Sequence, residues 1–88
     1  MVDVREPDER EAGFIPGSLN IPYRLVGSAD ADLDLASDSP VVTICESGAR
    51  AAVAASVLRA RGYDARPVID GGLSEWRRRG GAIATARS

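Results

Sequence analysis

Residues 40–50 have the sequence PVVTICESGAR, and this stretch decides the fold. Residues 41–44 form an unbroken, largely β-branched run, which is typical of a strand buried on both faces in a parallel sheet. After a short polar loop, residues 49–61 repeat apolar side chains at helical spacing until Gly62 ends the helix. Its many alanines would let this helix approach a sheet closely. Strand, loop and helix in this order predict one unit of an α/β domain.

The rest of the chain alternates between extended and helical segments. The sequence predicts a strand over residues 1–4, a helix over 7–12, an extended piece over 18–21, a strand over 67–69, and a helix over 74–79 capped by Ser74. Residues 27–39 are polar and predict a loop with one helical turn. Because strands alternate with helices, we expect parallel strands joined by right-handed crossovers in an α/β sandwich.

Length and composition narrow the class of protein. With 88 residues, the chain has room for one domain, which we place at residues 1–82, followed by a disordered tail at 83–88. A net charge of −2 argues against a nucleic-acid partner, and no apolar run approaches the ~20 residues that cross a bilayer. Since the chain has no histidine, serine–histidine and cysteine–histidine catalysis and most zinc sites are excluded. A single cysteine fits a reducing, cytoplasmic setting, and we expect a monomer.

The single cysteine, Cys45, follows the predicted buried strand at its carboxyl end, where open parallel sheets bind ligands. Gly48 gives the loop backbone conformations that other residues resist, so successive N–H groups can point inward and form an anion nest. The start of the next helix adds its positive dipole end. Both effects favour the thiolate, which is the nucleophile, without a separate base. The alternative is a buried cysteine that acts as a small hydrophobe.

Three stretches of the chain, in order and suitably spaced, resemble the rhodanese family across about residues 2–80. They are DVREPDE at 3–9 with GFIPGS at 13–18 and NIP at 20–22, then CESGAR at 45–50, and then DGGLSEW at 70–76. The resemblance implies a three-layer α/β/α fold around a central parallel sheet of four to five short strands, with the N-terminal strand shortened. Family members normally carry a further helix and strand before the first stretch, so either the first strand is shortened or the chain is a piece of a longer protein.

The resemblance also implies a function and a set of site residues. Cys45 would take a sulfane sulfur from thiosulfate or a persulfide and pass it to cyanide or a thiol, with no metal or organic cofactor. A protein sulfur carrier or a fused domain is a further partner that the family offers. By the same resemblance, the persulfide is held by the backbone N–H groups of Glu46, Ser47, Gly48, Ala49 and Arg50. Two arginines, Arg5 and Arg50, line the pocket. Asp3 has a structural role and pairs with an arginine.

Two rival functions stay open. One is a phosphatase or an arsenate-reductase-like enzyme on the same loop. Phosphatases that form a phosphocysteine, including some on this same fold, separate their cysteine and arginine by five residues, whereas four lie between Cys45 and Arg50. The shorter loop makes a narrower cradle, which favours a single sulfur atom over a phosphoryl group. The other rival is a non-catalytic interaction module that keeps the fold.

Some residues depart from the family pattern. Glu46 stands in the loop where catalytic members often carry a basic residue, and its carboxylate is expected to repel a dianion such as thiosulfate. This favours a small-molecule or protein persulfide as the donor. Phe14 and Arg10 replace a common histidine and a common aromatic residue, and we expect only local packing changes there.

Three other features have simpler explanations than a site. Asp30, Asp32 and Asp34 imitate the first ligands of a calcium loop, but the glycine and the closing glutamate that such a loop needs are missing. Residues 77–79 are three arginines at a helix end, where the dipole favours solvated positive charge. Trp76 is expected to be a packing residue.

Overall fold

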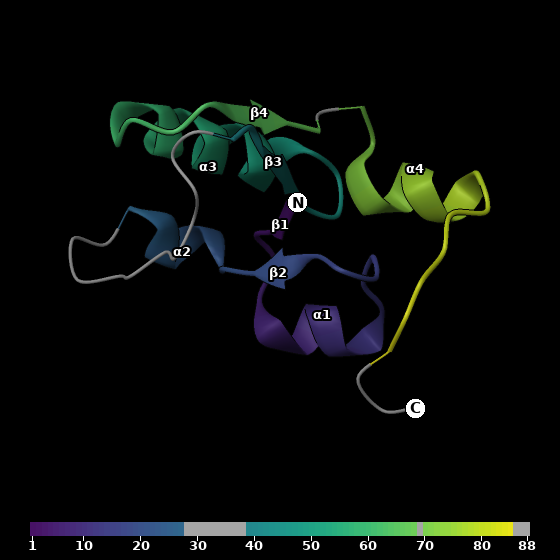
Figure 1. Ribbon diagram of the computed structural model, residues 1–88. Coiled ribbons are helices and arrows are strands. Elements are labelled where there is room, and N and C mark those ends of the chain that lie inside the picture. Colours follow the sequence, from purple (N-terminus) through teal and green to yellow (C-terminus); the bar gives the residue numbers. More distant parts are fainter. Residues whose placement is uncertain (28–38, 69, 86–88) are drawn as a thin grey trace.

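The computed structural model describes residues 1–27, 39–68 and 70–85. Its centre is a parallel sheet of four short strands in the order β2-β1-β3-β4 (Figure 1). The strands are β1 (Val2–Asp3), β2 (Leu19–Asn20), β3 (Val41–Ile44) and β4 (Ala65–Pro67). Every pair in this sheet is parallel, and Val2 lies opposite Leu19 on one side and Thr43 on the other. The predicted α/β class with a central parallel sheet is therefore confirmed.

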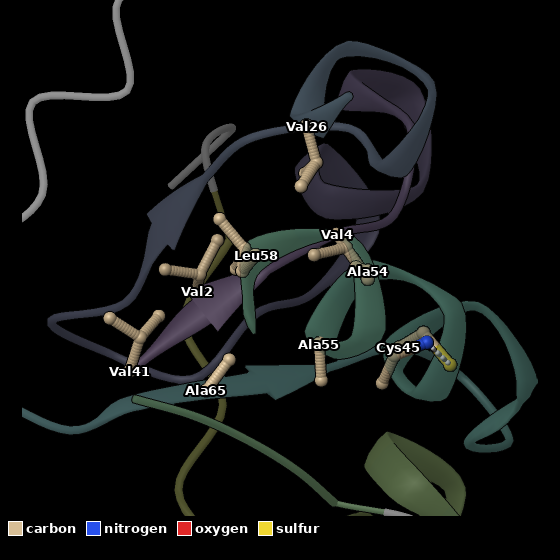
Figure 2. Packing of buried hydrophobic residues seen from close by; sticks show 10 residues of the cluster. Val2, Val4, Val26, Val41, Cys45, Ala54, Ala55, Leu58 and Ala65 are labelled. Atoms are coloured by element: carbon tan, nitrogen blue, oxygen red, sulfur yellow. Dashed lines mark hydrogen bonds between the residues drawn. The ribbon is translucent and has the colours of Figure 1, made fainter. Parts of the chain in front are cut away.

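Four helices surround this sheet within the described residues: α1 (Pro7–Ala12), α2 (Tyr23–Val26), α3 (Ala49–Ala60) and α4 (Gly72–Arg78). The longest of them, α3, packs on β3 and β4, and α2 packs against α3. In Figure 2, α4 lies on the opposite side of β3 from α3, so helices cover both faces of the sheet. Figure 1 places α1 beyond β2, at one edge. None of the helices described is both long and apolar enough to cross a membrane.

The core lies between α3 and the sheet (Figure 2). Ala51, Ala54, Ala55 and Leu58 form the buried face of α3. Because alanine side chains are small, the helix backbone can approach the strands closely, as the sequence predicts. Val53 is 55% exposed and does not contribute to this face.

Two strand and helix boundaries differ clearly from those predicted, and one short helix was not predicted. The strand β4 ends at Pro67 instead of beginning there; within the described sheet it lies at an edge, where a proline without an N–H is tolerated. The helix α4 begins at Gly72, after Gly71, so Ser74 does not cap it. The single-turn helix α2 is absent from the prediction, because four residues carry too little periodicity to reveal a helix.

Part of the segment at 83–88, where the sequence predicts a disordered tail, is paired with the domain. Ala84 forms an antiparallel bridge with Phe14, with both N–H···O distances at 2.9 Å. The indole N–H of Trp76 donates to the carbonyl of Ala82 at 2.9 Å, which fixes the turn after α4. Residues 86–88, the three aspartates of the calcium-like pattern and most of the predicted loop at 27–39 lie outside the described residues.

Candidate active site

Cys45 lies directly after β3, beside the first turn of α3 (Figure 2). Its Sγ accepts hydrogen bonds from the backbone N–H of Gly48 at 3.0 Å and of Ala51 at 3.4 Å. Gly48 precedes α3 with φ of +115°, a left-handed conformation that a side chain would resist. That conformation turns the chain into α3 within a few residues. Loop and helix N–H groups therefore converge on the sulfur of a side chain that is 1% exposed.

Asp3 and Arg5 form a buried ion pair close to this loop, each 1% exposed. Arg5 donates to the Asp3 carboxylate from Nε at 3.0 Å and from Nη2 at 2.8 Å. The guanidinium also donates to the backbone carbonyls of Glu9 at 3.3 Å and Gly13 at 2.6 Å. The predicted pairing of Asp3 with an arginine is confirmed. Arg5 is buried and bonded to the chain's own acceptors, so it braces the segment between β1 and α1.

Arg50 is bonded to Glu9 of α1. Its Nη1 and Nη2 donate to the two carboxylate oxygens of Glu9 at 2.6 and 2.8 Å. These hydrogen bonds lower the pKa of Glu9 to about 2 against the opposing effect of burial, and they raise the pKa of Arg50. Glu9 also accepts the backbone N–H of Glu6 at the start of α1. The Glu9–Arg50 pair therefore ties the helix after the loop to the segment that holds Arg5.

The low pKa of Glu9 predicts a pH-dependent contribution to stability. A carboxyl whose pKa is lowered by folding stabilises the protein above its unfolded pKa, near 4.5, and the contribution is lost as the pH falls towards about 2. Because the side chain is one-third exposed, solvent screening reduces the effect to about 1 kcal/mol. Urea unfolding of the wild type and Glu9→Gln should show a difference near neutral pH that shrinks below about pH 4.5. A difference that stays constant through that range would contradict the assignment.

Glu46 does not present a free carboxylate to the sulfur. Its Oε2 accepts hydrogen bonds from Oγ of Ser74 at 2.7 Å and from Nη1 of Arg77 at 2.6 Å, and its Oε1 lies 3.5 Å from Nη1 of Arg5. Two positive charges therefore offset the negative charge that the sequence places beside Cys45. Ser74 and Arg77 are absent from the predicted site. Nothing in the sequence reveals that α4 returns to the loop.

The backbone of α4 also holds the loop. The N–H of Leu73 donates to the carbonyl of Cys45 at 2.9 Å, and the N–H of Ser74 donates to the carbonyl of Glu46 at 3.1 Å. Gly72 makes this approach possible, because a Cβ there would lie 2.3 Å from the Cys45 oxygen. In a trans peptide the N–H points opposite to the C=O, so the N–H groups of Glu46 and Ser47 face away from α4. The contact thus fixes the direction of two peptide groups of the loop.

Among the residues that the structure describes, no cluster of three or more histidine, cysteine, aspartate or glutamate side chains could hold a metal ion. The chemistry available at this site is that of a thiol sulfur, the N–H groups around it and the charged pairs that frame the loop.

In this α/β domain, a cysteine follows a parallel strand at its carboxyl end, and N–H groups of the next loop and helix bind its sulfur. These features define a class of α/β domains with the cysteine in an anion-binding loop. Within that class, the chain belongs to the rhodanese-like domain family, whose family model matches residues 1–79.

Individual relatives agree with this membership. The chain is 35% identical over 80 residues to a sulfurtransferase of Allochromatium vinosum, covering 91% of this chain and 73% of that protein. It is 32% identical to the mitochondrial thiosulfate sulfurtransferase RDL2 of Saccharomyces cerevisiae, covering 93% of this chain and 62% of that protein. The crystal structure of a rhodanese-related protein from Thermoplasma volcanium matches with a TM-score of 0.83 and 32% identity, over 96% of this chain and 82% of that one.

Proposed function

We propose that this chain is a sulfurtransferase that carries a sulfane sulfur as a persulfide on Cys45. The observation that carries the proposal is the convergence of the Gly48 and Ala51 N–H groups on Sγ. Such donors stabilise negative charge on a sulfur atom and, after a small shift, on the outer sulfur of a persulfide. The sulfurtransferase names of two relatives support the same reaction.

The reaction proceeds by two displacements. The Cys45 thiolate attacks the outer sulfur of thiosulfate, a new S–S bond forms, and the S–S bond of thiosulfate breaks as sulfite leaves with the electron pair. Cyanide then attacks the outer sulfur of the persulfide, which releases thiocyanate and restores the thiolate. With a persulfide donor, the leaving group of the first step is a thiolate instead of sulfite. With a thiol acceptor, a thiolate instead of cyanide attacks the outer sulfur, a new persulfide forms on the acceptor, and the Cys45 thiolate leaves. The loop N–H groups hold negative charge in both steps, so no histidine is required.

The charged groups around the loop act as supports in this proposal. Arg5 and Arg50 are both bonded to acidic residues. The groups that contact the sulfur directly in this proposal are backbone N–H groups, with those of Gly48 and Ala51 already bonded to Sγ. The six-residue loop from Cys45 to Arg50 is one residue shorter than the phosphatase loops, which favours sulfur transfer over phosphoryl transfer. We place this reaction in the cytoplasm, carried out by a monomer.

Thiocyanate formation from thiosulfate or a small-molecule persulfide and cyanide tests the proposal. Cys45→Ser should reduce turnover by at least about 1000-fold, because the nucleophile is lost. Val53→Ser is a matched control, since this side chain is exposed and lies on α3 outside the loop. Turnover of an aryl phosphate without thiocyanate formation would show a phosphatase instead, and no turnover with any donor would indicate a non-catalytic module.

A further inference from the structure

The side chain of Glu46 is held by contacts from two directions. From α4, Ser74 and Arg77 donate to Oε2 at 2.7 and 2.6 Å. From the segment between β1 and α1, the buried Arg5 lies 3.5 Å from Oε1. The exposed fractions of Glu46 and Arg77 are 36% and 39%, so solvent reaches this pair. An exposed pair adds little to the free energy of unfolding. Its effect is expected instead on charged molecules that approach the neighbouring Cys45.

Arg77 differs from the two arginines that follow it. Arg78 and Arg79, which follows the last residue of α4, both bond to Glu75 of this helix, at 2.7 Å each. Arg77 is directed across the domain to the loop instead. This arrangement provides a comparison within one helix, because the loss of either Arg77 or Arg78 removes one positive charge but only Arg77 contacts the loop.

Each acidic side chain described around Cys45 lies beside at least one arginine. Asp3 pairs with Arg5 and also lies 3.6 Å from Arg10, and Glu9 pairs with Arg50. Glu46 is the acidic residue adjacent to the cysteine, and Arg77 is its closest cation. Without Arg77, the Arg5 contact at 3.5 Å would be the remaining cationic contact described for Glu46, and Arg5 is already bonded to Asp3. The loop would then present additional negative charge to an incoming anion.

We infer that Arg77 determines donor specificity: by neutralising Glu46, it allows the Cys45 loop to accept a dianionic donor of the thiosulfate type. This inference rests on the proposed sulfurtransferase function and reverses the sequence-based expectation that Glu46 disfavours thiosulfate relative to a persulfide donor. Arg77 acts through Glu46 and is a positioning residue, since it does not contact the sulfur in the described contacts.

Steady-state kinetics with thiosulfate provide the first test. Arg77→Gln should lower kcat/KM by about tenfold, mainly through a higher KM, because an anion then meets an uncompensated carboxylate. Arg77→Lys should retain most of the wild-type value, and Arg78→Gln is the charge-matched control. Combining Arg77→Gln with Glu46→Gln should recover kcat/KM to within about threefold of the wild type, since both charges are gone. Equal losses in the single and double variants would show a structural role and overturn the inference.

Alkylation of Cys45 provides a second test that does not depend on sulfur transfer. Iodoacetate and iodoacetamide are similar in size but differ in charge, so their rate ratio reports the electrostatic environment of the thiol. Arg77→Gln should lower the ratio of iodoacetate to iodoacetamide rates by about three- to tenfold relative to Arg78→Gln. A changed ratio in a protein that accepts no sulfur would overturn the proposed function but support the charge role of Arg77. Normal sulfur transfer with an unchanged ratio and an unchanged thiosulfate KM would overturn the role of Arg77 alone.

Discussion

Gly72→Ala is expected to lower the free energy of unfolding by about 3 kcal/mol and to abolish thiocyanate formation. Gly72 has φ of +51°, in the left-handed region where a Cβ is unfavourable. The added Cβ would also lie 2.3 Å from the carbonyl oxygen of Cys45 and 2.9 Å from that of Glu46. Both are backbone atoms of the loop, so the clash can be relieved only by moving the loop or α4. Either movement disturbs the peptide groups whose N–H directions the contact fixes.

Urea unfolding and the thiocyanate assay measure these two effects. Gly62→Ala is the matched control, because Gly62 has φ of +96° but nothing lies within 4 Å of its added Cβ. This control should lose only about 1 kcal/mol and keep its activity, since backbone strain alone is present. Equal unfolding midpoints for the two variants would contradict the close approach of α4 to the loop.

Asp3→Asn is expected to destabilise the protein by about 3–5 kcal/mol, because it leaves the buried Arg5 guanidinium without its counter-charge. The substitution keeps the size of the side chain, removes the negative charge, and converts one of the two oxygens that accept from Arg5 into an NH2 donor. Arg10, whose Nη1 lies 3.6 Å from the same carboxylate, would add to the unbalanced positive charge. The Asn20 amide bonds to the carbonyls of Asp3 and Arg5, so the strain would spread along β1 and β2.

The matched control for this variant is Asp64→Asn. Asp64 pairs with Arg66 at 3.0 Å, but their side chains are 56% and 65% exposed, so the change should stay within about 0.5 kcal/mol. Chemical denaturation at neutral pH measures the free energy of unfolding of both variants and of the wild type. Similar unfolding free energies for Asp3→Asn and the wild type would show that the buried pair does not support this part of the fold.

The segment from β3 to α3 was predictable almost residue by residue, because its signals are local. A β-branched run specifies the strand, and a glycine followed by alanine-rich helical spacing specifies the loop and helix. The shift of β4 has the opposite cause. Pro67 is unfavourable inside a central strand, and only the observed strand order reveals that β4 lies at an edge.

In the candidate site, too, the local features were predictable and the long-range contacts were not. Cys45 and the left-handed Gly48 follow from the loop sequence. The pairs that frame the loop do not, since Glu9 and Arg50 are separated by 41 residues and Glu46 and Arg77 by 31. Such contacts depend on how helices pack around the sheet, and no local pattern encodes them. The sequence therefore predicts the charge of Glu46 correctly but not its neutralisation.

Intact-mass measurement of the protein after incubation with thiosulfate or a persulfide donor tests the central claim most directly. If Cys45 carries the sulfur as a persulfide, the mass of the protein should increase by that of one sulfur atom. The increase should disappear when cyanide is added and should not occur in Cys45→Ser. An unchanged mass with every donor, or an adduct that persists in Cys45→Ser, would contradict the claim that this cysteine carries the sulfur.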